Sequence, residues 1–282
     1  MRCNSQGAGL QSKTPLVSVI IPTFNSERTI ERCCRSVKHQ SYSNIEIVVV
    51  DRHSSDSTLE IAGKSSAKVW LLDSERSVAK NFGVAKAKGG FIMFIDSDMA
   101  LSSNIVDECV ELCLNENAEA VIMPELPISS GGFFGKCRTI EKSLYSGDEL
   151  LAIPRFFTRK LFQEMGGFDE SLIYGEDADL YARIKKNIRR IIRAKTQILH
   201  LEGDFSWRNL VLKAYYYGEN LFIFLKKNPL LGMRRVGAIC LVRNIKLMIK
   251  SPVTFLGVVL IKIVEYMAYL VGVLSSFIKT EQ

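Results

Sequence analysis

Several signatures of common protein classes are missing from this chain of 282 residues. Its seven cysteines are an odd number at irregular spacing and include no C-x-x-C pair, so the sequence gives little support to a zinc site. We interpret these cysteines as buried, reduced thiols of a cytosolic protein. Residues 1–14 are polar and lack the apolar core of a signal peptide, so we expect a disordered leader.

Glycine is missing where two classes of nucleotide-binding enzyme need it. The loop expected after the first strand, residues 23–28 (TFNSER), contains none. A dinucleotide-dependent oxidoreductase requires G-x-G-x-x-G at this place, and a sugar nucleotidyltransferase requires a glycine-rich, basic loop. The absence of glycine therefore argues against both classes.

Positive charge is present in excess but is unevenly distributed. The formal net charge is +7, yet nine basic residues and a single acid, Glu219, fall within residues 208–250. The net charge of that stretch, nine positive minus one negative, exceeds the net charge of the whole chain. The remaining residues together are therefore close to neutral. This distribution argues against a nucleic-acid groove across the main domain, and we expect no nucleic-acid partner.

Short apolar runs alternate with helical patterns over the first 125 residues. The runs lie at residues 16–22, 45–50, 69–72, 91–95 and 120–123. The helical patterns lie at residues 27–40, 55–65, 77–88 and 102–115. This alternation predicts an α/β fold with a Rossmann-like, mostly parallel sheet and helices on both faces.

The sheet locates the functional site before any motif is considered. Ligands of such sheets bind at the carboxyl ends of the strands. The residues that directly follow four of the predicted strands are 23–26, 51–56, 74–76 and 96–98. Three of these four loops contain acidic residues, so we expect a polar site at this edge of the sheet.

The pattern changes twice in the second half of the chain. Residues 129–175 are interrupted by glycines, and we expect a loop-rich insert that determines specificity. A helix is predicted at residues 177–186 and a strand or extended arm at residues 190–200. From residue 207 onward we predict an all-helical extension, with helices at residues 210–227, 231–250 and 252–278.

Two carboxylates, Asp96 and Asp98, follow the buried strand FIMFI in the motif Asp96-Ser97-Asp98. Carboxylates two residues apart leave a strand end on the same side and can share a divalent cation with a diphosphate. Mn²⁺ and Mg²⁺ favour one or two carboxylates together with phosphate oxygens. The motif therefore predicts a Mn²⁺ or Mg²⁺ site that neutralises a departing diphosphate.

Other polar residues at strand and helix ends predict contacts with a nucleotide. Asp51 follows the second strand, where its carboxylate can accept hydrogen bonds from a base or a ribose. Arg76 and Lys80 lie one turn apart at the start of a helix that faces the same site. A solvated helix face is the alternative for this basic pair.

Acids also gather at the start of the helix predicted near residue 177. Glu176, Asp177 and Asp179 fall within four residues, and helix capping accounts for one acid but not for three. One of them can act as a general base on an acceptor hydroxyl, because crowded carboxylates tend to raise the pKa of one member. His200 ends the extended arm and is either a structural residue or a metal ligand beside Asp98.

Four segments, in this order, resemble the family 2 glycosyltransferases of GT-A fold. They are VSVIIPTFN, IEIVVVDRHSSDST, ERSVAKNFGVAKAKGGFIMFIDSD and RKLFQEMGGFDESLIYGEDADLYARI. The resemblance runs from Val17 to about His200, roughly two-thirds of the chain. It implies a GT-A domain at residues 15–205, with a nucleotide-sugar half at 15–125 and an acceptor half at 126–205.

The resemblance implies an inverting, single-displacement transfer from a UDP- or GDP-sugar. By this analogy Asp51 contacts the base, Asp96 the ribose side and Asp98 the metal, while Asp177 is the general base and Glu176 helps to place the acceptor. Further donor contacts are implied for Pro22, Thr23, Asn25, Arg76, Lys80 and Ser97.

The sequence departs from the family pattern at three places. Lys80 stands where arginine is usual, which replaces a two-pronged phosphate contact by a point charge. Arg52 and His53 replace the usual pair after Asp51, which leaves the base preference open. The Gln-x-x-Arg-Trp signature of processive synthases is absent, so we expect one sugar to be added per encounter.

The resemblance does not cover the extension at residues 206–282. Its basic, amphipathic helices and the apolar helix at 252–278 predict association with the cytoplasmic face of a membrane, with a lipid-linked acceptor such as a polyprenyl phosphate. Lys262 and Glu265 would share a face of the last helix, which favours an interfacial position over a clean span. Packing onto the main domain, or between subunits of a homo-oligomer, is the alternative.

A protein that binds sugar nucleotides or lipids without catalysis is the competing hypothesis from another class, beside the sugar nucleotidyltransferase. Such a protein needs no general base. Asp177 is therefore the residue whose substitution separates an enzyme from a binding protein.

Overall fold

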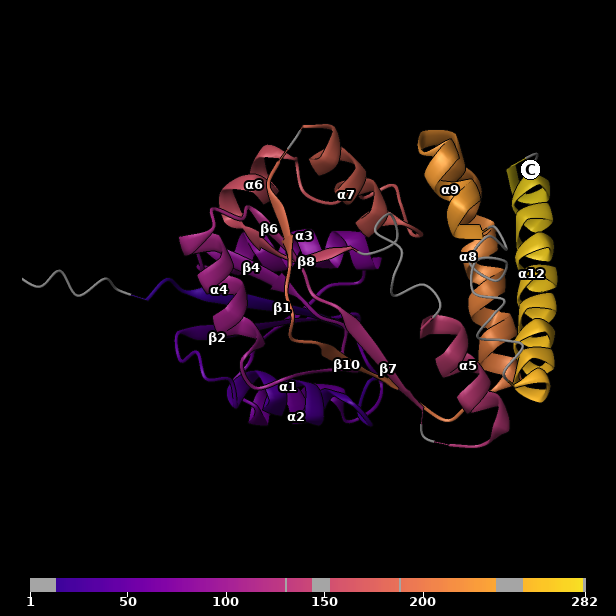
Figure 1. Cartoon of the computed structure of the whole chain (residues 1–282), viewed down its shortest axis with the longest axis horizontal. Helices are drawn as coiled ribbons and strands as arrows, with labels where there is room; N and C mark the ends of the chain where they lie inside the picture. The colour runs from indigo at the N-terminus through magenta and orange to yellow at the C-terminus, as the bar shows by residue number, and fades with distance from the viewer. Residues whose placement is uncertain (1–13, 130, 144–152, 188, 237–250, 281–282) are drawn as a thin grey trace, which may run out of the picture.

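The computed structural model describes residues 14–129, 131–143, 153–187, 189–236 and 251–280 (Figure 1). The predicted leader lies outside these residues apart from Thr14, and so do residues 237–250 of the helix predicted at 231–250. Two parts stand beside each other in Figure 1: an α/β domain and a helical layer.

A seven-stranded sheet forms the centre of the α/β domain. Its strands are β1 (Val17–Thr23), β2 (Ile45–Asp51), β3 (Lys68–Leu71), β4 (Phe91–Phe94), β6 (Ala120–Ile122), β8 (Pro154–Thr158) and β9 (Ile191–Arg193). Their order across the sheet is β3-β2-β1-β4-β8-β6-β9. Neighbouring strands are parallel except where β8 pairs with β4 and with β6. The sheet is therefore mostly parallel, as predicted.

Alternation along the strands directs side chains to two helical layers. Val19 and Ile21 of β1 belong to a core cluster shared with α1 (Ile30–Lys38), α2 (Thr58–Lys64) and α4 (Ile105–Asn115). Ile20, between them, belongs to a second cluster, which includes residues of α3 (Arg76–Lys86), α6 (Arg159–Glu164) and α7 (Glu176–Lys186). Because successive strand residues point to opposite faces, both faces are covered.

The expectation of a loop-rich insert at residues 129–175 is wrong for much of that stretch. It contains α5 (Phe133–Ser143), β8 and α6, and β8 lies in the middle of the sheet. Phe156 and Phe157 of β8 are both buried, and Phe156 stacks on Phe91 with ring centroids 5.3 Å apart. Of the glycines that suggested a loop, Gly131 and Gly132 precede α5, Gly166 and Gly167 follow α6, and Gly135 lies in the first turn of α5, which it does not break.

A second, three-stranded sheet carries part of the site. It consists of β5 (Met99–Leu101), β10 (Ile198–Glu202) and β7 (Glu125–Ser129), with β10 in the middle. The extended arm predicted at residues 190–200 is thus divided between β9 and β10. In the antiparallel pairing of β10 with β5, His200 lies opposite Met99. Because Met99 directly follows Asp98, this register brings His200 to the acidic loop after β4.

The helical layer consists of α5, α8 (Trp207–Lys227), α9 (Pro229–Val236) and α12 (Pro252–Thr280) (Figure 1). Helices α8 and α12 approach closely because each has a glycine at the contact. A Cβ atom on Gly218 would lie 2.3 Å from the backbone oxygen of Tyr269, and one on Gly272 would lie 2.2 Å from that of Tyr215. Any larger residue at either position would force the helices apart.

Candidate active site

A cleft of about 490 Å³ opens at the carboxyl ends of β1, β2 and β4. It is lined by Pro22, Thr23, Phe24, Ser26, Val50, Arg52, Ser74, Glu75, Arg76, Ala79, Lys80, Asp96, Ser97, Asp98, Arg155, Asp177, His200, Lys213 and Tyr216. Nine of the twelve predicted site residues are among them, whereas Asn25, Asp51 and Glu176 are not. The position agrees with the rule that placed the ligand at this edge of the sheet.

The loops after β1 and β2 are fastened to each other behind the cleft wall. Asp51 is fully buried, and its carboxylate accepts hydrogen bonds from the hydroxyls of Thr23 (2.7 Å) and Ser54 (2.6 Å). Asn25 has a positive φ of 47°, and its side-chain oxygen accepts a hydrogen bond from the backbone of Ser55 (2.9 Å). These contacts hold the loop shape, and the predicted contacts of Asp51 and Asn25 with a donor stay predictions.

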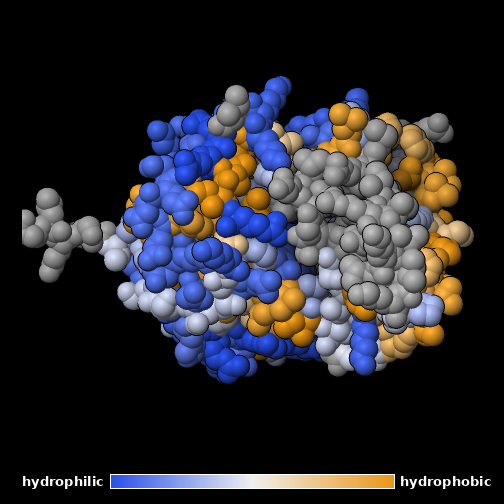
Figure 2. Space-filling model, viewed as in Figure 1, coloured by the Kyte–Doolittle hydropathy of each residue, from blue (hydrophilic) through white to orange (hydrophobic). Residues whose placement is uncertain are grey.

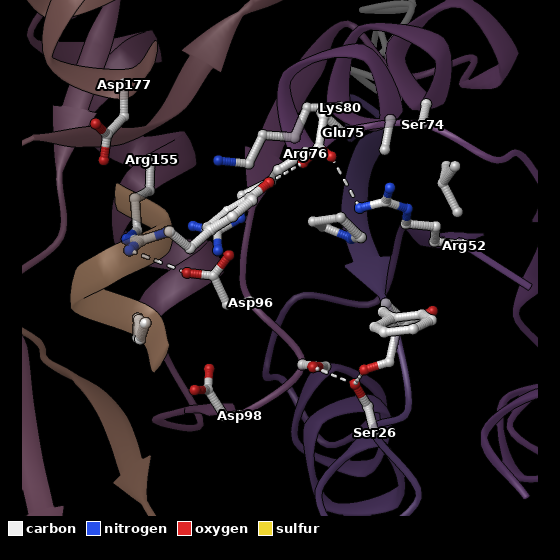
Figure 3. A pocket seen from close by; sticks show the side chains of 18 of the residues that line it. Ser26, Arg52, Ser74, Glu75, Arg76, Lys80, Asp96, Asp98, Arg155 and Asp177 are labelled. Atoms are coloured by element: carbon white, nitrogen blue, oxygen red, sulfur yellow. Dashed lines mark hydrogen bonds and ion pairs between the residues drawn. The ribbon is translucent and has the colours of Figure 1, made fainter. Parts of the chain in front are cut away.

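Asp96 lies among cations on the floor of the cleft. Its carboxylate is 3.4 Å from the guanidinium of Arg155, and Figure 3 shows the two side chains pointing toward each other. Burial alone would raise the pKa of Asp96, but the charges of Arg155, Arg76 and Lys80 outweigh burial and hold it well below its usual range. Asp96 is therefore ionised, and the cations around it can also attract a diphosphate.

Asp98 is placed differently from Asp96. One of its oxygens, Oδ2, lies 3.3 Å from Nε2 of His200, while the other, Oδ1, is buried and has no hydrogen-bond partner among the described residues. Nδ1 of His200 lies 3.1 Å from the carboxylate of Glu125. Burial opposes protonation of His200, but the hydrogen bonds with Asp98 and Glu125 outweigh it and raise the pKa of the imidazole.

This arrangement fits a divalent cation. An unsatisfied buried carboxylate oxygen is costly, and a metal ion at this place would satisfy it. Glu125 is positioned to hold the Nδ1 proton of His200, which leaves Nε2 as a ligand. Among the described residues no group of three or more His, Cys, Asp or Glu side chains could hold a metal ion. Asp98 and His200 thus offer two ligands, and phosphate oxygens and water would complete the shell.

The three acids at the start of α7 have separate surroundings. Glu176 is buried and pairs with Lys80 at 3.1 Å, and Asp179 is buried and pairs with Arg183 at 2.9 Å. Burial would raise the pKa of Asp179, but its hydrogen bonds and Arg183 lower it. The crowding expected from the sequence is thus relieved by cations. Asp177 is the member of the three whose side chain lines the cleft (Figure 3).

Three polar or aromatic cleft residues, Arg155, Lys213 and Tyr216, lie outside every segment that the sequence analysis assigned to the site. Arg155 comes from β8, and no sequence motif indicated that this strand lies inside the sheet. Lys213 and Tyr216 come from α8, outside the segment that resembles a known family, although their spacing of three residues places both on one helix face. Phe24 was part of a quoted motif, and its side chain is 58% exposed in the cleft.

Curated relatives point to one class of enzyme. The chain is 32% identical to "Glycosyltransferase GlyG" of Streptococcus pneumoniae serotype 4, over 71% of this chain and 78% of that protein. It is also 32% identical to "UDP-Glc:alpha-D-GlcNAc-diphosphoundecaprenol beta-1,3-glucosyltransferase WfgD" of Escherichia coli, over 46% of this chain and 54% of that one. The chain thus matches about half of the length of WfgD.

Solved structures share the fold. The mannosyltransferase PcManGT from Pyrobaculum calidifontis, in complex with GDP-Man and Mn2+, superposes with a TM-score of 0.62 over 93% of this chain and 88% of that chain, at 18% identity. S. aureus TarS 1-349 in complex with UDP-GlcNAc gives a TM-score of 0.57 over 71% of this chain and 65% of that chain, at 21% identity. These similarities confirm the predicted GT-A fold.

The match to a family profile covers the acidic loops and the strands that carry them. The profile described as "Glycosyl transferase family 2" matches residues 18–165, which include β1, β2, β4 and the motif Asp96-Ser97-Asp98. The chain belongs to glycosyl transferase family 2 and is a glycosyltransferase.

Proposed function

We propose that the cleft binds a nucleotide-diphosphate sugar and that the enzyme transfers one sugar to an acceptor by an inverting single displacement. The observation that carries this proposal is the unsatisfied Oδ1 of Asp98, which lies beside His200 in a cleft that also contains Arg76 and Asp177. A metal ion that holds the donor diphosphate would satisfy this oxygen. Asp177 in the same cleft offers the general base that a transferase needs and a binding protein does not.

The diphosphate of the donor is assigned to the cationic and metal-binding part of the cleft. Asp98 and His200 would hold Mn²⁺ or Mg²⁺, which would stabilise the negative charge of the leaving diphosphate. Arg76 begins α3, so its guanidinium and the amino end of that helix act on the same anion. Lys80 pairs with Glu176, so we assign it mainly to holding α7 against α3.

The base and ribose are assigned to the loops after β1 and β2. Pro22, Thr23 and the exposed ring of Phe24 line this end of the cleft, and Asp51 lies behind them. An aromatic ring that faces a cleft offers a surface on which a flat base can stack. The base is uridine or guanosine, in keeping with the UDP-sugar named for TarS and WfgD and the GDP-Man named for PcManGT.

Asp177 is the proposed general base. One of its oxygens accepts a hydrogen bond from the backbone of Ala178 (2.7 Å), which holds the carboxylate at the amino end of α7. In Figure 3, Asp96, Asp98 and Asp177 lie on the side of the cleft away from Arg52 and Ser74. An acceptor hydroxyl that reaches the donor from the α7 side would meet Asp177, which can remove its proton during attack.

The acceptor is proposed to be lipid-linked, and the enzyme to work at the cytoplasmic face of a membrane. WfgD is named for an acceptor joined to diphosphoundecaprenol. Residues Pro252–Ile278 of α12 are long and apolar enough to cross a membrane, by length and composition only. Figure 2 shows apolar side chains along the edge of the molecule where Figure 1 places α12, and Val253 and Leu270 are 65% and 59% exposed.

The charges of α12 favour an interfacial position over a span. Lys262 and Glu265 are buried against α5, where Lys262 lies 2.6 Å from Glu141 and Glu265 lies 3.2 Å from Arg138. To cross a bilayer alone, α12 would have to break these ion pairs in a medium without water, at a cost of several kcal/mol. The helix can instead keep its charged face on the protein and press its apolar face into the membrane surface.

Thermal shift with a panel of nucleotide diphosphates and nucleotide sugars, each with and without Mn²⁺ or Mg²⁺, tests the donor site. We expect one base to raise the melting temperature only when metal is present, and Asp98→Ala to abolish this shift. Asp107→Ala on α4, which removes a carboxylate remote from the cleft residues, is the control and should keep it. The absence of a shift with every nucleotide would refute the proposal.

A further inference from the structure

An apolar groove of about 650 Å³ runs between α8 and α12. It is lined by Val211, Leu212, Tyr215, Ile263, Val264, Met267, Ala268 and Val271. The hydroxyl of Tyr215 is directed to Glu219 (3.0 Å) and Ser275 (2.8 Å), so Tyr215 contributes its ring to the groove. Leu212 and Met267 are 55% and 64% exposed, so much of the wall is left without an apolar partner among the described residues.

The groove and the cleft share helix α8. Leu212 and Tyr215 line the groove, while their neighbours Lys213 and Tyr216 line the cleft. With 3.6 residues per turn, Leu212 and Tyr216 lie one above the other on the helix surface. The face of α8 that borders the groove therefore adjoins the face that borders the cleft, and a ligand that crosses this edge of the helix can occupy both.

Positive charge lies on the cleft side of α8, next to the residues that line the groove. Lys213 lies in the cleft wall and is exposed, and Lys142 of α5 interacts electrostatically with it. Burial and the charges of Lys213 and Arg138 lower the pKa of Lys142 to about 8, even though Asp98 acts in the opposite direction. An anion held between Lys142 and Lys213 would relieve their repulsion.

We propose that the groove holds the hydrocarbon chain of a lipid phosphate acceptor, with the phosphate at Lys213 and the reacting end in the cleft. An apolar trough that ends at cations matches a molecule with a long apolar chain and an anionic head. A flat membrane surface offers no single chain to fill such a trough, and a second protein would have to place an anion at its end. The inference rests on the proposed transferase function, because it names the acceptor of the same site.

Equilibrium binding of farnesyl phosphate to the full chain in detergent-free buffer tests the groove without turnover. Farnesol and inorganic phosphate are measured in parallel to separate the chain from the anion. We expect farnesyl phosphate to bind at least tenfold more tightly than either part. The double variant Leu212→Ser/Met267→Ser should lose about tenfold of this affinity, which corresponds to about 1.4 kcal/mol, and should keep the affinity for inorganic phosphate.

The matched control is Leu256→Ser/Leu274→Ser on α12, with side chains 66% and 55% exposed outside the groove. It should bind farnesyl phosphate as the wild type does. Equal losses in both double variants would show unspecific adhesion and overturn the proposal. So would a dimer, seen by light scattering, that dissociates only in Leu212→Ser/Met267→Ser, because the groove would then be an interface between copies.

The thermal-shift measurement with nucleotide sugars separates a failure of the groove proposal from a failure of the transferase proposal. If farnesyl phosphate binds in the groove but no nucleotide sugar shifts the melting temperature, the transferase proposal fails and the lipid site stands. If nucleotide sugars bind with metal but farnesyl phosphate binds no better than inorganic phosphate, the groove proposal fails alone.

Discussion

Two clusters of partly buried charge lie on the two sides of this molecule, and they are built differently. In the helical layer, Arg138, Glu141, Lys262 and Glu265 form a closed group in which each charge contacts two of opposite sign, at 2.6 to 3.2 Å. In the cleft, Asp96 and Arg155 pair similarly, but within the part of the chain that the structure describes Oδ1 of Asp98 has no hydrogen-bond partner. The first group is complete without a ligand, and the second is not.

The two clusters therefore have different roles: the charges of the helical layer hold helices together, and those of the cleft are available to a ligand. Burial would raise the pKa of Glu265, but Arg138 and Lys262 lower it, so Glu265 stays ionised and helps to join α12 to α5. Such a cluster specifies how the helices meet, although apolar residues of similar volume could be equally stable. The cleft instead keeps carboxylates whose remaining capacity is available to a metal, a donor or an acceptor proton.

The largest expected effect is on catalysis and comes from one acid of α7. Asp177→Asn should lower the transfer rate by about a thousandfold, because an amide cannot accept the acceptor proton. Donor affinity should stay unchanged, since the substitution keeps the shape of the side chain. Single-turnover rates and donor titration by calorimetry measure the two quantities separately.

The neighbouring acid serves as the control for this comparison. Asp179→Asn removes the charge of a buried carboxylate that pairs with Arg183, so it should lower stability and leave the transfer rate of the folded enzyme nearly unchanged. Normal transfer by Asp177→Asn would remove it from the base role. A large loss of rate in Asp179→Asn alone would place the base at Asp179, two residues further along α7.

The next effect is on stability and lies in the helix cluster. Lys262→Met leaves Glu141 and Glu265 with Arg138 as their remaining cation, so the free energy of unfolding should fall by about 3 kcal/mol. Urea unfolding followed by circular dichroism measures it. Lys64→Met removes an exposed partner of Glu60 and should leave stability nearly unchanged, because solvent screens this pair. Equal losses in both variants would mean that burial of the cluster contributes nothing.

The smallest effect concerns pH and the contact between α7 and α8. Lys227 lies 2.9 Å from Asp179 and also pairs with Asp169, whose pKa is lowered to about 2 by these contacts with Lys227 and Ser171. A carboxylate with a lowered folded pKa stabilises the protein above its unfolded pKa of about 3.9 and loses this contribution as the pH falls toward 2.

Lys227→Met should therefore be less stable than the wild type by about 1 kcal/mol at pH 7, since the lysine is partly exposed. The difference between the two proteins should shrink as the pH falls from 4 to 2. Urea midpoints at pH 7 and pH 3 provide the measurement. A difference that stays constant or grows toward low pH would contradict the assignment of these ion pairs.

Most of the sheet was predictable because its signals are local. The runs that became β1, β2 and β4 are short, apolar and β-branched or aromatic. Asp51 marks the end of β2, and Asp96 follows β4 closely. The strand β8 was missed because Phe156 and Phe157 lie in a five-residue strand between glycine-containing segments. Its antiparallel place between β4 and β6 depends on residues distant in the sequence, which no local pattern reports.

Some residues of the site were likewise predictable from local sequence motifs, and others were not. Asp98 and Asp177 were recognisable by their motifs, but Arg155 and Lys213 were not, because they reach the cleft from an inserted strand and from the helical layer. The role proposed for His200 beside Asp98 depended on how the arm folds, and the pairing of β10 with β5 brings the two together at 3.3 Å. The metal role of this pair stays a proposal.

By itself, the sequence determined the alternation of strands and helices, the acids at the strand ends, and the apolar length of residues 252–278. These features depend on neighbours within a few residues, where periodicity and side-chain chemistry act directly. Tertiary structure decided which charges have partners: Lys80 pairs with Glu176 and Lys262 with Glu141, whereas Oδ1 of Asp98 has no hydrogen-bond partner in the described ranges. Pairing requires atoms within about 4 Å, and only the folded chain brings distant residues that close.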